Sequence, residues 1–169
     1  MKRICFIVFL ASFISCSHDK ETVKTDKVSY DTVALKKRIT NIYDSMHMEF
    51  KAKKYNDMLG YLADDGAYYG TDPSEVWTKH QLSNFLLGTL TDSTKLKYTV
   101  SDRRILPGDD GKSAVVIEQF FMGNMSTKIE VRSVSRATFR NDRWLIDVYS
   151  WNFIPKNGDI SKLNKALSD

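Results

Sequence analysis

The sequence predicts an α+β domain in which helices come first and strands follow. Up to about residue 90, apolar residues recur at spacings of three and four, which is typical of amphipathic helices. From about residue 96 onward, apolar residues alternate with polar ones, which is typical of half-buried strands. Short turn signals separate these strands, so the two patterns indicate three helices followed by an antiparallel meander.

The first helix is expected to begin near Asp31 or Thr32, because either side chain can cap it. A short second helix is expected to begin at a cap on Asn56, and residues 64–66 are expected to end it before a brief strand over residues 67–71. The apolar stripe of the first helix consists of Ile39, Ile42, Tyr43, Met46 and Phe50.

A turn and a third helix come next. Asp72-Pro73 predicts the turn, since proline keeps the residue before it out of helical geometry. Thr78 and Gln81 have the spacing of a capping box and predict that the third helix begins there. The buried side of this helix is expected to carry Leu82, Phe85, Leu86 and Leu90.

The second half of the domain is expected to form the sheet, because its apolar residues alternate with polar ones. A tight hairpin is predicted at residues 122–125 and a second turn at Asn141-Asp142. Residues 156–169 are polar and are expected to form a C-terminal tail. The expected strands lie at residues 96–100, 114–122, 129–139 and 144–153.

Residues 1–15 have the features of a secretory signal peptide. Lys2 and Arg3 give a positive start, and residues 4–14 form an apolar run that is too short for the ~20 residues of a membrane-crossing helix. The small residue Ser15 precedes Cys16, and this resembles the lipoprotein class, in which Cys16 becomes the lipid-modified N-terminus. The alternative is an ordinary signal peptide whose cysteine is incidental.

Residues 16–29 are charged and show no periodicity, so they are expected to form a disordered tether. The domain would then extend over residues 30–155, anchored by lipid in the bacterial cell envelope at the outer membrane. The acidic residues after Cys16 resemble an export signal of surface lipoproteins, although a charged tether would look the same. Both a periplasmic and a surface-facing orientation therefore stay open.

Composition excludes several classes of function. Loss of Lys2 and Arg3 with the signal would leave 23 of the 25 basic residues against 21 acidic ones, so no nucleic-acid partner is expected. The only two cysteines are Cys5 and Cys16, which leaves the mature domain without a disulfide, a cysteine metal site or a cysteine nucleophile. The histidines are scattered, so no metal and no cofactor is expected.

One segment carries a family resemblance. Residues 62–77, followed by the helix at Lys79, resemble the SnoaL-like branch of the nuclear transport factor 2 (NTF2-like) superfamily. The most specific part is Gly70-Thr71-Asp72-Pro73-x-Glu75-x-Trp77, and residues 144–146 and 150–151 fit the last strand of the family. The resemblance covers residues 32–154. It implies an NTF2-like cone, in which three helices wrap a curved antiparallel sheet around a pocket and the outer sheet face supplies a homodimer surface.

The resemblance leaves catalysis open, because the superfamily includes ketosteroid isomerases, cyclases, dehydratases and members without known catalysis. Ketosteroid isomerase-like sites need a carboxylate base on the first strand and a tyrosine on the first helix. Aligned without gaps, these positions fall on Gly70 and Met46. Asp72 and Tyr43 lie nearby but out of register. Many relatives carry histidines in the last strand, where this chain has Val148 and Ser150.

The catalytic candidates are therefore Asp72, Glu118 and Tyr43, each with an alternative. Asp72 is either a general base or a turn residue. Glu118 is a site residue if it faces inward and a sheet-surface residue if it faces outward. Tyr43 or Tyr69 would be the hydrogen-bond donor. The candidate ligand-binding residues, whose aromatic members are alternatively core, are Tyr69, Asp72, Trp77, Glu118, Ser150, Trp151 and Asn152.

These observations favour a lipid-anchored envelope domain that binds a small apolar ligand or a protein partner without catalysis. The first alternative is an isomerase, cyclase or dehydratase that uses a pocket carboxylate. The second is an interaction module whose pocket is filled by its own side chains.

Overall fold

In the computed structural model, the described residues are 29–89, 97–123, 125, 126 and 128–168. The predicted signal peptide and the predicted lipidation site at Cys16 lie outside them, as do the predicted tether up to residue 28 and the predicted apolar positions Leu90 and Leu96. These predictions therefore stay predictions.

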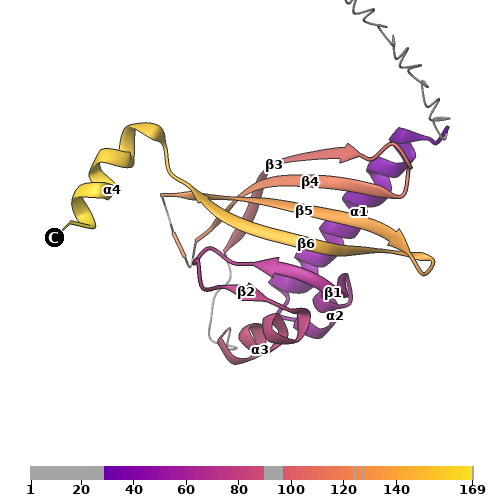
Figure 1. Cartoon of the computed structure of the whole chain (residues 1–169), viewed down its shortest axis with the longest axis horizontal. Helices are drawn as coiled ribbons and strands as arrows, with labels where there is room; N and C mark the ends of the chain where they lie inside the picture. The colour runs from indigo at the N-terminus through magenta and orange to yellow at the C-terminus, as the bar shows by residue number, and fades with distance from the viewer. Residues whose placement is uncertain (1–28, 90–96, 124, 127, 169) are drawn as a thin grey trace, which may run out of the picture.

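The helices and strands follow the predicted order, with helices before the main sheet (Figure 1). In chain order the described elements are α1 (Thr32–Lys51), α2 (Tyr55–Leu59), β1 (Leu62–Tyr69), β2 (Val76–Trp77), α3 (Lys79–Thr89), β3 (Tyr98–Pro107), β4 (Ser113–Met122), β5 (Glu130–Arg140), β6 (Arg143–Ile154), a 3-10 turn (Asn157–Asp159) and α4 (Ile160–Ala166).

The strands form one curved, open sheet in the order β2-β1-β6-β5-β4-β3. Figure 1 shows α1 running across one face of this sheet, with α2 and α3 beside its β1–β2 end. Neighbouring strands are antiparallel except for β1 and β6, which are parallel, so the predicted meander ends with β1 added beside its last strand. The α+β class and the three helices against a curved sheet are confirmed.

Local signals account for the two long helices. Asp31 caps α1 by accepting the backbone N–H groups of Val33 and Ala34 at 2.9 and 3.0 Å. In front of α3, the Gln81 side chain accepts the Thr78 N–H at 2.8 Å, and the Thr78 hydroxyl accepts the Gln81 N–H at 3.3 Å. Both predicted caps are therefore confirmed.

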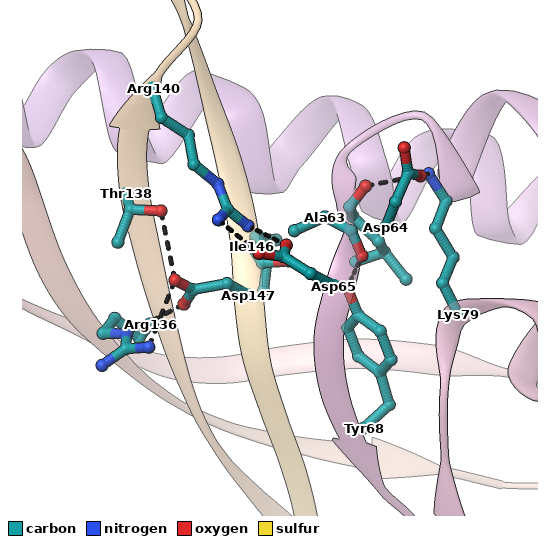
Figure 2. Close-up of polar contacts among 11 residues, drawn as sticks. Ala63, Asp64, Asp65, Tyr68, Lys79, Arg136, Thr138, Arg140, Ile146 and Asp147 are labelled. Carbon is teal, nitrogen blue, oxygen red and sulfur yellow. Dashed lines mark hydrogen bonds and ion pairs between the residues drawn. The ribbon is translucent and has the colours of Figure 1, made fainter.

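The predicted end of the second helix is wrong in detail. Helix α2 begins at Tyr55 rather than after a cap at Asn56, and residues 64–66 belong to β1 instead of a break. Figure 2 shows the reason, because the two exposed carboxylates of this segment are paired across neighbouring elements. Asp64 binds Lys79 at 2.7 Å and Asp65 binds Arg140 at 2.6 Å. These pairs allow charged residues to continue an edge of the sheet.

Two predicted turns and the predicted C-terminal tail can be compared with the structure. Asn141 and Asp142 both have positive φ, 52° and 60°, as a two-residue hairpin requires, so this turn is confirmed. The tight hairpin predicted at residues 122–125 is wrong, because β4 ends at Met122 and β5 begins only at Glu130. The predicted tail is also wrong in part, since it contains α4, which Figure 1 shows standing off from the sheet.

Tyr68 fastens β1 to β6 where β1 is irregular. Its buried hydroxyl lies 2.7 Å from the carbonyl oxygen of Ala63 and 3.0 Å from that of Ile146, and it can donate to either (Figure 2). A Cβ atom on Gly66 would collide with this hydroxyl, so glycine is needed there for the close approach. The parallel pair therefore depends on a contact that the sequence pattern does not display.

The two faces of the sheet differ sharply. The helix-facing side chains of β4 and β5 are buried and form the core with α1, α2 and α3. The opposite face has no helix on it in the described part of the chain (Figure 1). Its exposed apolar side chains include Leu106, Val115, Phe121 and Val134, each more than a third accessible.

We predict that Tyr68→Phe lowers the free energy of unfolding by about 1–3 kcal/mol, because buried carbonyl oxygens lose their donor. The neighbouring exposed residue supplies a matched control, and Tyr69→Phe should change stability by less than about 0.5 kcal/mol. Urea denaturation followed by circular dichroism measures both. Equal losses for the two variants would contradict the assigned role of the Tyr68 hydroxyl.

Candidate functional site

A cavity of about 280 Å³ lies between the helices and the sheet. Side chains from α1, α2, α3 and all six strands or their connections contribute to it, and most of these side chains are apolar. Its polar members are His47, Tyr98, Tyr149, Thr71 and Glu75. A concave apolar space with a few polar groups is the usual form of a small-molecule site. The domain therefore has room for a ligand and is not filled by its own side chains.

The motif around Gly70 builds one part of the wall. The Gly70 N–H donates to the Glu75 carbonyl at 2.9 Å, and the Glu75 carboxylate accepts the Asp72 N–H at 3.0 Å. A Cβ atom on Gly70 would collide with the Glu75 side chain, so glycine allows that side chain to fold back over the turn. The turn delivers Trp77 to the cavity, where its ring stacks on Phe85 at 4.8 Å between centroids.

A second aromatic wall comes from the last strand. Tyr149 and Trp151 lie two residues apart on β6, so both point to the helix-facing side, and their ring centroids are 4.4 Å apart. The two walls present flat apolar surfaces that suit a ring-containing or otherwise rigid apolar molecule.

One end of the cavity is polar. His47 of α1 and Tyr98 of β3 line it together, and the His47 Nε2 atom lies 3.1 Å from the Tyr98 hydroxyl oxygen. The same two residues also line a shallow outer groove with Asp44, Lys51 and neighbours on β3. His47 and Tyr98 therefore form the partition between the cavity and this groove.

A fully buried carboxylate stands behind the partition. Glu118 of β4 has no accessible surface, and its Oε1 atom accepts a hydrogen bond from Arg103 Nε at 2.6 Å. The other oxygen lies 3.2 Å from His47 Nε2. Arg103 also donates to Asp44 of α1 at 2.7 Å. Because a buried charge needs compensation, this cluster joins α1, β3 and β4 at one place.

The phenols near this end remain neutral donors. Burial raises the pKa of Tyr98 well above its usual range, and the Glu118 carboxylate adds to the effect. Burial likewise raises the pKa of Tyr149, with smaller contributions from Tyr98 and Glu118. Glu118 therefore acts against a second negative charge at this end of the cavity, whereas Arg103 acts in the opposite direction.

Two of the residues predicted from the sequence to bind ligand line the cavity, namely Trp77 and Trp151. Glu118 faces inward, as one of its two readings required, but it lies behind His47 and does not line the cavity. Asp72 is exposed in the turn, where its carboxylate accepts hydrogen bonds from the Ser74 N–H and hydroxyl. These bonds hold the pKa of Asp72 below its usual value, which matches the reading as a turn residue.

The remaining predicted site residues also lie outside the lining. Tyr69, Ser150 and Asn152 belong to the opposite face of the sheet, as the pairing of Tyr69 with Ser150 shows. Tyr43 is fully buried, and its hydroxyl lies 2.6 Å from the Ser135 hydroxyl, so it is a core residue beside the Glu118 cluster.

Sequence reasoning missed His47, Tyr98 and Arg103 as members of the site. The available signal for His47 was its position four residues after Tyr43, which places both on one helix face. The sequence pattern could not identify Arg103. The strand β3 is irregular between Val100 and Asp102, and beyond this point the other set of alternate residues faces inward. The gap-free alignment with the ketosteroid isomerase pattern did identify cavity residues, because Gly70 and Met46 both line the cavity.

A metal-binding cluster and a membrane-crossing helix are both absent from the part of the chain that the structure describes. No three histidine, cysteine or acidic side chains lie close enough together to hold a metal ion there. No described helix has the length and apolar character that a membrane crossing requires.

A family model described as a SnoaL-like domain matches residues 39–150, which is well over half of the chain. No curated protein matches the sequence.

Solved structures agree on the fold. An NTF2-like protein of unknown function from Pseudomonas putida matches with a TM-score of 0.62 at 10% identity, covering 76% of this chain and 92% of its own. An NTF2-like protein from Cytophaga hutchinsonii matches with a TM-score of 0.59 at 14% identity, covering 70% and 98%. A protein of unknown function with a cystatin-like fold from Nostoc punctiforme has a TM-score of 0.60 at 15% identity, covering 76% and 97%. Identities this low show the fold alone.

Proposed function

The chain belongs to the family of SnoaL-like domains, and from that premise we propose that it binds a small, largely apolar molecule in its cavity without doing chemistry on it. The observation that carries the proposal is the 280 Å³ cavity with its two aromatic walls. Burial of apolar ligand surface against these walls supplies the affinity, at about 25 cal/mol for each Å² removed from water.

The geometry favours binding over catalysis. Isomerases of this superfamily form an enolate, which needs stabilised negative charge near the reacting carbon. Here burial, and after it the Glu118 carboxylate, raise the pKa of Tyr98 and so act against negative charge at its hydroxyl. The aligned positions of the base and the helical tyrosine are occupied by Gly70 and Met46, which have no acid or hydroxyl group.

One observation favours the isomerase or cyclase alternative. The Glu75 side chain occupies the space into which a side chain on Gly70 would extend, so a carboxylate does reach the aligned base position from five residues downstream. Mass spectrometry of ligand recovered after incubation decides between the two functions. Unaltered ligand supports binding, and a converted ligand supports catalysis with Glu75 as the base.

We predict that Leu86→Trp abolishes binding of the uncharged fluorescent probe N-phenyl-1-naphthylamine, because Leu86 lines the cavity and indole would fill it. Leu87→Trp is the matched control, since this neighbour on α3 is 54% exposed. It should bind like the wild type. Equal binding by both variants, measured by fluorescence titration, would place the probe elsewhere.

We further propose that the domain is tethered to the cell envelope through lipid on Cys16. The support is the sequence pattern of residues 1–16. Cys16→Ser should abolish incorporation of radiolabelled palmitate and release the protein from the membrane fraction. Cys5→Ser, in the apolar run, should leave both unchanged. Palmitate labelling that persists in Cys16→Ser would remove the proposed anchor.

We also propose that the helix-free sheet face is a homodimer surface. Leu106, Val115, Phe121 and Val134 place exposed apolar side chains on this face, and such patches mark association sites. Val134→Glu should therefore convert a dimer into a monomer in sedimentation velocity at micromolar concentration. Val33→Glu, on the exposed side of α1, is the control. A wild-type monomer would contradict the proposal.

A further inference from the structure

We propose that the cavity selects uncharged apolar molecules that place one hydroxyl or carbonyl oxygen beside Tyr98, and that it rejects molecules that bring a carboxylate there. This inference rests on the proposed binding function and narrows it to a chemical class of ligand. It follows from the hydrogen-bond roles at the polar end, the charges around the cavity and the volume available.

The hydroxyl group of Tyr98 keeps one hydrogen-bonding position for a ligand. The guanidinium of Arg103 can only donate, and its Nη2 atom lies 3.5 Å from His47 Nδ1, so Nδ1 faces it as an acceptor. On its other side, His47 Nε2 lies 3.1 Å from the Tyr98 hydroxyl oxygen and 3.2 Å from Glu118 Oε2. The Tyr98 hydroxyl also forms a hydrogen bond with Tyr149. His47 and Tyr149 therefore use two of its three hydrogen-bonding positions, and one is left for a ligand in the cavity that Tyr98 lines.

The charges around the cavity are acidic. Among the described residues that line it, there is no lysine or arginine, and Glu75 is the one carboxylate. Two cations of the described chain lie near the polar end. Arg103 is engaged by Glu118 and by Asp44, and Lys51, whose Nζ lies 5.6 Å from the centroid of the Tyr98 ring, lines the outer groove. A ligand carboxylate would therefore lose hydration in an apolar space whose described lining offers it no lysine or arginine.

The pKa of Tyr98 indicates how the polar end of the cavity affects a negatively charged oxygen. Burial and the Glu118 carboxylate together keep its phenol protonated, with the pKa far above that of a phenol in water. Burial acts on Tyr149 in the same direction. A ligand oxygen at hydrogen-bond distance from Tyr98 experiences the same environment, so an uncharged oxygen is accepted and an anionic one is penalised.

The volume admits a bicyclic probe. A cavity of about 150 Å³ lined by apolar side chains holds benzene, and the cavity here has about 280 Å³. Naphthalene, 2-naphthol and 2-naphthoate share one ring system and differ only in the polar group. At about pH 7 the first two are uncharged and the third carries one negative charge, so they separate the contributions of apolar burial, the hydroxyl group and charge.

Equilibrium dialysis of the three probes against the wild-type domain tests the inference. We expect 2-naphthol to bind about tenfold more tightly than naphthalene, which is the size of one net hydrogen bond. We expect 2-naphthoate to bind at least about tenfold more weakly than 2-naphthol. Tyr98→Phe should remove the preference for 2-naphthol over naphthalene. Tyr30→Phe is the matched control, because its hydroxyl bonds to the Gly108 carbonyl and lies outside the cavity lining.

The outcomes separate this inference from the proposed function. If naphthalene binds but 2-naphthol gains nothing, or if 2-naphthoate binds as tightly as 2-naphthol, the selectivity is overturned while apolar binding stands. If Tyr98→Phe, shown to be folded by circular dichroism, keeps the preference, the assignment to Tyr98 is overturned. If none of the three probes binds the wild type, the proposed function fails together with the inference. The wild-type comparison needs no variant and stands even if Tyr98→Phe does not fold.

Discussion

The buried carboxylate of Glu118 is the constraint on which the arrangement of the domain depends. A charge without any accessible surface must be compensated, and Arg103 of β3 provides the compensation, while His47 of α1 lies 3.2 Å from the other carboxylate oxygen. Because Arg103 also reaches Asp44, the cluster holds α1 at a defined position across the sheet. That position sets one end wall of the cavity, so the same ion pairs that order the core also shape the site.

This cluster links stability to ligand chemistry. His47 and Tyr98 line the cavity and also lie next to the buried Glu118 cluster, so charges in the core act on the polar end of the site. We propose binding without catalysis because a buried carboxylate next to the site opposes the negative charge of an enolate. The SnoaL-like fold alone does not decide between the two functions.

The turn between β1 and β2 shows how a short motif can carry spatial information. Gly70 leaves room for Glu75, Asp72 organises the turn through Ser74, and Trp77 is delivered to the cavity wall. These contacts are local, so the sequence was sufficient to locate this part of the site. The same motif explains the role of Asp72. This residue is acidic and close to the pocket, but its carboxylate accepts hydrogen bonds from Ser74 and holds the turn.

By itself the sequence determined the α+β class, the caps of α1 and α3, the Asn141-Asp142 hairpin and the cavity wall around Trp77, because each depends on residues close together in the chain. Only the tertiary structure decided that β1 joins β6 in parallel, and that His47, Tyr98, Arg103 and Glu118 meet at one end of the cavity. The irregularity in β3 changes which alternate residues of the strand face the helices. The packing of α1 on the sheet then brings these four side chains from three elements together. No spacing along the chain encodes such a meeting, because the compensation of a buried charge is settled by distance in space.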